Sequence, residues 1–472
     1  YTSSFKPPTE PLTNITNTKL LCCNNSSTTG STVTPGTITA NGDPTASTDS
    51  PFDDPAAFTF GDAGDQGIIK CGSYVGNGSN DGPEIFVGWE PQWLLVKSTG
   101  TDHWQIIDVM RGMANGSADG RLRADVDSAE TNSIDYWSPT PTGLKIRFAS
   151  GEVNSNNVTY IYMCIRRPDG YVGKPPELGT DVFAMDTAAS SYPKYSAGFA
   201  PDWVFSRRPA VAESWKTMTR LTGTGKAFLN TTAAWGTDNG IVWDNNTHFK
   251  GGGGDDANTY KAWMWRRHAG FDVVTYEGTG TTHQIAHSLN KTVEMFWLKS
   301  RDSSANWMVW HKGLNGGTNP EQYFIRLNLN NAESQGSSFG DTAPTSTHFT
   351  VGASSNAINT DGDDCIALLF ASVDGISKVG YYSGSNSSQT ISTGFAPRFL
   401  MMKKVDTEQG WVVLDTALGW SSGDDERLEF HNDSAQNDSI DFGAPTSSGF
   451  TLTGNVEKSN QSGGSYIYYA HA

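Results

Sequence analysis

Four segments of this 472-residue chain follow the same plan at intervals of roughly 100 residues. Each segment closes with a short apolar run, at residues 161–167, 260–267, 365–371 and 466–470. A fixed period of this kind indicates one folding unit copied in tandem. Catalytic sites are usually single, whereas repeated units supply length, surface and valency. The repeat therefore favours a structural or adhesive protein over an enzyme.

A tryptophan recurs at the same place in every copy, upstream of the closing run and just before a strand-like stretch. These residues are Trp104, Trp215, Trp307 and Trp411. A turn and a hydrophobic strand precede each of them, and a further turn and strand follow. We expect the four tryptophans to occupy equivalent positions. The copies are set at residues 68–167, 181–267, 270–372 and 376–472, with a linker at 168–180.

The spacing of turn residues predicts strands rather than helices. With 51 Gly and 21 Pro, turns recur every ~8–12 residues, and the runs between them are rich in Val, Ile, Tyr, Phe and Trp. A unit of this size can bury a core of its own. We predict an all-β fold: a tandem array of four antiparallel β-sandwich (jelly-roll-like) domains, each with its own core.

The N-terminal part differs in composition from the four copies. Residues 11–67 are poor in hydrophobic side chains and rich in Thr, Ser, Pro, Asn and Asp, with one apolar anchor at 20–23. This predicts an extended linker. Because Tyr1 is not an initiator methionine and no signal peptide follows it, we expect the chain to be a piece of a longer protein.

Charge and cysteine content exclude several classes of protein. The net charge of −17 argues against nucleic-acid binding, which requires a basic face. No apolar run approaches the ~20 residues of a membrane span, so no membrane insertion is expected. The five cysteines form neither a disulfide framework nor a zinc motif. Cys164 and Cys365 lie in closing runs, where we expect them to be buried.

Two acidic clusters resemble metal sites only in part. Residues 361–364 (Asp-Gly-Asp-Asp) look like part of a calcium loop, but the expected bidentate Glu is missing, and a hairpin turn is the alternative. Residues 424–426 (Asp-Asp-Glu) fit a solvated turn equally well. We expect no metal and no cofactor.

No catalytic motif stands out. Glu130 and Glu333 occupy matching positions, but Trp235 and Gln436 replace them in the other copies, which favours a hydrogen-bonding or capping role over glycoside cleavage. His283 and His287 have i, i+4 spacing in a strand-like stretch, where it forms no helical metal pair. We predict no catalytic residues.

Several tryptophans fall outside or at the margins of the repeated core positions. Exposed rings of this kind stack on sugars, whereas the alternative is that they seal sandwich ends or subunit contacts. Trp235 belongs to this group. The predicted ligand-binding residues are Trp89, Trp137, Trp243, Trp310 and Trp420.

At these motifs the chain resembles a known family. Residues 72–79, 88–97, 108–113, 160–167 and 311–323 are similar to repeats of tail-fibre proteins from marine (cyanobacterial and pelagic) bacteriophages, and the resemblance covers 11–472. Residues 1–10 resemble the last strand and exit of a laminin-G or concanavalin-like lectin domain, which implies a jelly-roll domain upstream. The second copy departs from the others, with Arg220-Leu221-Thr222 where the first has residues 108–111.

The resemblance implies a virion fibre or adhesin and supplies no catalytic residues. We therefore expect a non-enzymatic tail-fibre protein that mediates attachment to the host surface. The alternatives are a structural spacer, a capsid-attached fibre or a polysaccharide depolymerase. The implied partners are other copies of the chain (a homo-oligomer, with a trimer favoured), other virion proteins, and a host-surface glycan or protein receptor.

Overall fold

The computed structural model describes residues 12–22, 27–41, 67–173, 175–252, 254–353 and 356–472. The predicted lectin-like strand at 1–10 lies outside these ranges. Residues 1–67 and 68–472 form separate compact units. In the first unit the described residues contain one small antiparallel pair, β1 (Leu21–Cys22) and β2 (Ser31–Val33).

In the second unit, each of the four repeated segments contains one large antiparallel sheet. We call residues 68–167, 181–267, 270–372 and 376–472 repeats 1 to 4. The large sheets, in spatial order, are β3 (Ile69–Val75), β10 (Thr159–Arg166), β5 (Pro91–Ser98), β6 (Gln105–Asp108) and β7 (Arg121–Arg123) in repeat 1; β11 (Phe183–Thr187), β18 (Lys261–Trp265), β13 (Trp203–Arg207), β14 (Lys216–Thr219), β15 (Gly225–Phe228) and β16 (Gly236–Thr237) in repeat 2; β19 (Phe271–Glu277), β26 (Asp364–Phe370), β21 (Met295–Ser300), β22 (Met308–His311), β23 (Tyr323–Arg326) and β24 (Ser334–Gln335) in repeat 3; and β27 (Ser377–Ser383), β34 (Ser465–His471), β29 (Phe399–Lys404), β30 (Val412–Asp415) and β31 (Leu428–Glu429) in repeat 4.

A smaller antiparallel sheet accompanies each large one. These sheets are β4 (Glu84–Phe86), β9 (Gly143–Ile146) and β8 (Trp137–Thr140); β12 (Tyr195–Ser196) and β17 (His248–Phe249); β20 (His283–Ala286) and β25 (His348–Val351); and β28 (Gln389–Ser392), β33 (Gly449–Leu452) and β32 (Pro445–Thr446). The helices among the described residues are short 3-10 turns: η1 (Gly179–Asp181), η2 (Arg220–Thr222), η3 (Leu314–Gly317), η4 (Pro320–Gln322) and η5 (Thr416–Leu418). The predicted all-β fold is confirmed.

No helix in the described part of the chain is both long enough and apolar enough to span a membrane.

The repeated landmarks have the same place in every large sheet. The closing runs form the strand between the first and third positions, which is β10, β18, β26 or β34. Trp104, Trp215, Trp307 and Trp411 each directly precede the fourth strand, which is β6, β14, β22 or β30. The prediction that the four tryptophans are equivalent is therefore confirmed.

The two faces of the large sheet have different surroundings in repeat 1 and in the other repeats. In repeat 1 the strands alternate: Leu94 and Val96 are buried in the core that includes the small sheet, while Trp93 and Leu95 are only partly covered. In β13, β21 and β29 every residue is buried. A sheet buried on both faces needs a second cover.

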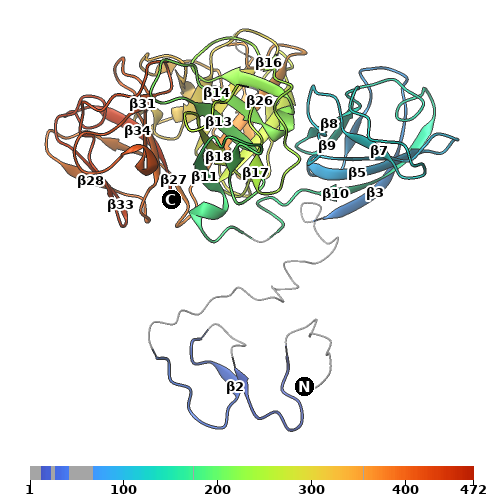
Figure 1. Ribbon diagram of the computed structural model, residues 1–472, viewed down its shortest axis with the longest axis horizontal. Helices are drawn as coiled ribbons and strands as arrows, with labels where there is room; N and C mark the ends of the chain where they lie inside the picture. Colours follow the sequence, from blue (N-terminus) through green and yellow to red (C-terminus); the bar gives the residue numbers. More distant parts are fainter. Residues whose placement is uncertain (1–11, 23–26, 42–66, 174, 253, 354–355) are drawn as a thin grey trace. The chain divides into compact units, whose positions relative to one another are not determined.

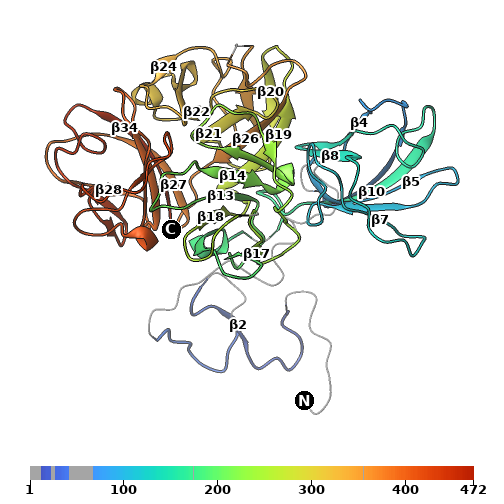
Figure 2. The same cartoon turned by 45° about the horizontal axis from the view of Figure 1, so that its top comes forward.

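Repeats 2, 3 and 4 cover one another. A single hydrophobic core contains side chains of all three, and aromatic rings meet across each junction. The ring centroids of Trp203 and Trp297 are 5.6 Å apart, those of Phe205 and Phe430 are 5.4 Å apart, and those of Phe370 and Tyr469 are 5.0 Å apart. The expectation of four independent cores is therefore wrong for these repeats. We call residues 181–472 the three-repeat ring, and repeat 1, in blue to teal, lies beside it (Figures 1 and 2).

Candidate functional site

The recurring tryptophans hold the three-repeat ring together. Each donates its indole N–H to a main-chain carbonyl of a neighbouring repeat: Trp215 to Glu429, Trp307 to Phe228 and Trp411 to Arg326, all at 2.9 Å. The register of the sheets gives the three acceptors the same position, one residue after the partner of the middle strand. Repeat 2 thus bonds to repeat 4, repeat 4 to repeat 3, and repeat 3 to repeat 2, which closes the ring.

A buried basic residue makes a second contact at each junction. Arg207 donates to the carbonyl of Asp433 at 3.2 Å, Lys299 to that of Thr232 at 3.1 Å, and Lys403 to that of Asn330 at 3.1 Å. Each acceptor lies four residues beyond the carbonyl that accepts the tryptophan. All three side chains are fully buried, and burial lowers the pKa of Lys299 to about 8 and that of Lys403 to about 7.

A third contact uses the main chain at the position of the matching glutamates. The amide of Trp235 donates to the carbonyl of Arg301 at 2.9 Å, that of Glu333 to Val405 at 2.7 Å, and that of Gln436 to Pro209 at 2.7 Å. The position therefore carries a backbone bond that tolerates Glu, Gln or Trp. The side chains of Glu130 and Glu333 also make local bonds, to the Arg111 guanidinium and to the Asn315 amide, each at 2.8 Å.

Repeat 1 docks on the ring through a buried ionic network. The Arg267 guanidinium of repeat 2 makes two bonds to Glu90 of repeat 1, at 2.7 and 2.6 Å, and one to Asp272 of repeat 3 at 2.6 Å. Arg167 of repeat 1 lies 3.3 Å from each of the two carboxylates. Burial alone would raise the pKa of Asp272, but Arg267 and Arg167 lower it to about 2. The network joins three repeats at one point.

The five tryptophans predicted to bind a ligand are all buried. Their exposed fractions are 2% for Trp89, 0% for Trp137, 6% for Trp243, 4% for Trp310 and 2% for Trp420. Trp243 and Trp420 donate their indole N–H groups to the carbonyls of Gly223 and Gly443, both at 2.8 Å. The expectation that these rings are exposed is wrong: they seal the interiors of their repeats.

The acidic clusters are parts of turns. Gly362 adopts a left-handed φ of 80° in the turn that precedes β26, and the Asp363 amide bonds to the Thr360 carbonyl at 3.0 Å. Asp425 is fully buried and accepts the amides of Ser421 and Phe442 at 3.0 and 2.7 Å. Burial raises its pKa to about 6.

Histidine and cysteine side chains are dispersed. His283 is partly exposed in β20, whereas His287 is buried beyond the strand end. Cys164 and Cys365 are buried as predicted, and Cys71 is exposed. Over the ranges that the structure describes, His, Cys, Asp and Glu form no group of three suited to a metal ion.

Two surface cavities collect polar side chains. A cavity of about 410 Å³ between repeats 1 and 2 brings Glu130 and Trp243 together with Arg111. Another, of about 530 Å³, lies beside the linker at 168–180 and is lined by Asp169, Arg266 and other residues.

Sequence reasoning missed the basic residues at the junctions. Lys97, Arg207, Lys299 and Lys403 occupy the same position, near the end of the third strand of each large sheet. The available signal was a basic residue that recurs within an apolar strand.

Comparison with known proteins places the chain in a family without an assigned function. No curated protein matches the sequence. A family profile matches residues 10–167 and 182–472, which include all four repeats. The chain therefore belongs to the DUF7483 family, a domain of unknown function.

Proposed function

We propose that this protein is a non-enzymatic bacteriophage fibre protein that takes part in attachment to the host surface. Its repeat motifs resemble those of marine phage tail fibres, and its fold is built from repeated β units. The observation that carries the proposal is the use of equivalent residues at the three ring junctions, where Trp215, Trp307 and Trp411 bind neighbouring repeats. This arrangement gives a rigid body, which suits a fibre that transmits load between a virion and a cell.

The positions that recur are used for assembly rather than for acid–base chemistry. Glu130 and Glu333 lie in different repeats, and each accepts local hydrogen bonds. Thr219, His311 and Asp415 share one position in the sheet, so no acid or base is kept there. These features support binding or structure over polysaccharide cleavage.

The burial of the five tryptophans favours a second candidate, a structural spacer within the same kind of appendage. A glycan platform needs open ring faces, and Trp137 and Trp420 present none. In the spacer alternative, another part of the virion contacts the receptor.

Phage adsorption in the presence of the purified chain tests the proposal. Host cells are preincubated with the chain, and free phage is counted over time. We expect saturable binding of the chain to cells and at least a several-fold slower adsorption. Binding without slower adsorption would contradict a role in attachment, and virions that lack the protein by mass spectrometry would contradict both candidates.

Incubation with host-surface polysaccharide tests the enzyme alternative. We expect an unchanged size distribution and no rise in reducing ends over hours. A steady rise would overturn the proposal. Glu130→Gln and Glu333→Gln variants would then show whether either matching carboxylate carries the reaction.

A further inference from the structure

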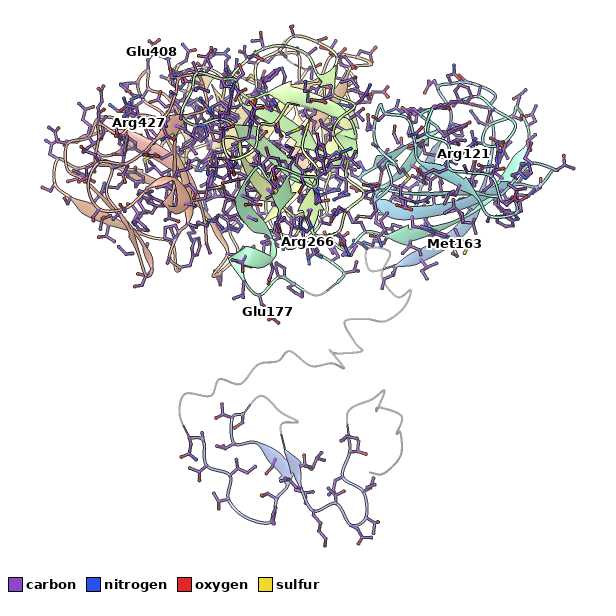
Figure 3. The ribbon with its side chains drawn as sticks, viewed as in Figure 1. Arg121, Met163, Glu177, Arg266, Glu408 and Arg427 are labelled. Carbon is purple, nitrogen blue, oxygen red and sulfur yellow. The ribbon has the colours of Figure 1, made fainter. Side chains whose placement is uncertain are left out.

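The outer face of the large sheet in repeat 1 has no cover within the chain. Ile69 and Ile161 are 47% and 41% exposed, and Cys71 is exposed beside them. Met163, on the middle strand β10, points away from the small sheet of its repeat (Figure 3). The face is a patch of apolar side chains on a flat sheet, which is a feature of interaction surfaces.

The same face is fully covered in every other repeat. Leu95, Ile106 and Leu122 form a row across β5, β6 and β7 of repeat 1 and are only partly buried. The row in repeat 3 is Trp297, Val309 and Ile325, and that in repeat 4 is Met401, Val413 and Leu428; all six are at most 1% exposed. Their cover comes from the two neighbouring repeats of the ring.

Repeat 1 also has the polar groups that cross the ring junctions. Trp104 stands where Trp215, Trp307 and Trp411 donate, and it is partly exposed. Arg123 follows Leu122 as Phe228 follows Ala227, so its carbonyl has the position of the ring acceptors. Lys97 has the position of Lys299, and within the chain it bonds only to nearby carbonyls, those of Ser98 and Gly100, at 2.9 and 2.7 Å.

We propose that three copies of this chain assemble through repeat 1 in the arrangement that repeats 2, 3 and 4 adopt within one chain. At each junction the Trp104 indole of one copy donates to the Arg123 carbonyl of the next. Lys97 donates to the Asp127 carbonyl, and the Glu130 amide donates to the Thr99 carbonyl. The apolar rows of the three sheets then form a shared core on the threefold axis.

Closure at three follows from the ring. Each junction joins a donor side of one repeat to an acceptor side of the next, so it is heterologous, and heterologous contacts close only when the rotation per step divides a full turn. Repeats with this sheet order close after three steps inside the chain. Repeat 1 has the same strand order, β3-β10-β5-β6-β7, and the same two sides.

One position predicts a looser contact than within the ring. Leu229, Leu327 and Phe430, which follow the acceptor residues, are fully buried at the junctions, and repeat 1 has exposed Ala124 there. The smaller side chain removes apolar area from each junction. The trimer should therefore dissociate on dilution before the three-repeat ring unfolds.

The molar mass of the full 472-residue chain tests the proposal. Light scattering and sedimentation over a wide concentration range should give three times the 50.9 kDa of one chain at high concentration and a monomer on dilution. Leu95→Glu places a charge on the proposed axis and should abolish the trimer while leaving circular dichroism unchanged. The matched control is Phe86→Glu, because Phe86 is 69% exposed on the small sheet of the same repeat.

Zero-length carbodiimide cross-linking of a mixture of ¹⁴N- and ¹⁵N-labelled wild-type chains tests the register without a mutation. We expect mixed-isotope peptides that join Lys97 to the acidic segment around Asp127 and Glu130. They should be at least several-fold depleted in a diluted sample.

Several outcomes would overturn the proposal. They are a monomer or dimer at every concentration, a trimer that Leu95→Glu leaves intact, and a trimer that only Phe86→Glu dissociates. A monomer whose Cys71 resists maleimide, followed by mass spectrometry, would show that another part of the chain covers the face. If Leu95→Glu fails to fold, the wild-type mass and the cross-links still decide.

Discussion

At the residue scale, polar and aromatic side chains are used against their usual preference for partial exposure. Lys299 and Lys403 are fully buried and point at main-chain carbonyls. Buried polar groups are costly unless they are hydrogen-bonded, so these lysines depend on the loops of the neighbouring repeat. Their positions are specific to assembly, because the equivalent Lys97 in repeat 1 is only partly buried.

His311 shows how such a residue couples the ring to pH. It is fully buried, its Nδ1 accepts the Gly313 amide at 2.9 Å, and its Nε2 lies 3.3 Å from the Tyr468 carbonyl of repeat 4. This pattern fits a neutral imidazole that donates from Nε2. Burial is the main cause that lowers the pKa of His311 to about 3.

Acid should therefore destabilise the protein well above the pKa of folded His311. The unfolded chain binds a proton near pH 6.5, whereas folded His311 binds one only near pH 3, so stability falls as pH decreases between these values. His311→Gln removes the titration and should flatten the dependence of the urea midpoint between about pH 6.5 and 4. His283→Gln, at a partly exposed site, should leave it unchanged. Equal slopes in all three proteins would contradict this assignment.

At the element scale, the indole bonds tie strand to strand across the repeats. Trp307, just before β22, reaches the carbonyl at the end of β15, and its ring is fully buried. Trp297, in β21, is equally buried, but its indole N–H finds no acceptor among the described residues. The two tryptophans therefore form a natural pair for measuring the bond.

Replacing each tryptophan by phenylalanine separates packing from hydrogen bonding. Both changes remove the same atoms from the core, but only Trp307→Phe leaves a buried carbonyl without its donor. We expect Trp307→Phe to lower the free energy of unfolding by about 1 kcal/mol more than Trp297→Phe, within a range of about 1–3 kcal/mol. Urea denaturation followed by circular dichroism measures both. Equal losses would show that the indole bond adds no net stability.

At the scale of the whole molecule, repeats 2, 3 and 4 form one folding unit. Phe430 of repeat 4 packs against Phe205 and Trp215 of repeat 2 and Trp297 of repeat 3. Removing one repeat would expose the inner faces of the other two. The ring therefore differs from linear repeat arrays, in which each unit contacts only its neighbours in sequence.

A chain truncated after residue 372 should lose its cooperative unfolding transition and bind a hydrophobic dye, because repeats 2 and 3 lose their cover. The control is a chain of residues 68–472, which lacks the separate N-terminal unit and should unfold at an unchanged midpoint. Calorimetry and dye fluorescence measure both. A sharp transition in the shorter chain would show that the repeats fold independently.

Part of the fold could be predicted because it depends on local patterns. Turn spacing and β-branched or aromatic runs specify strands, and the period identified the recurring Trp104, Trp215, Trp307 and Trp411. The same patterns misled the site prediction. Trp89 and Trp420 lie outside the repeated core positions in the sequence, but their rings fill sandwich interiors in the structure.

The sequence by itself determined the β class, the fourfold repeat and the equivalence of its landmarks, because strand formation and turns depend on residues close together in the chain. Only the tertiary structure decided which sheet faces meet. Leu95 and Met401 are similar apolar residues at one repeated position, yet Met401 is buried by neighbouring repeats and Leu95 remains partly open. The difference arises from contacts between residues hundreds of positions apart, which no local pattern specifies.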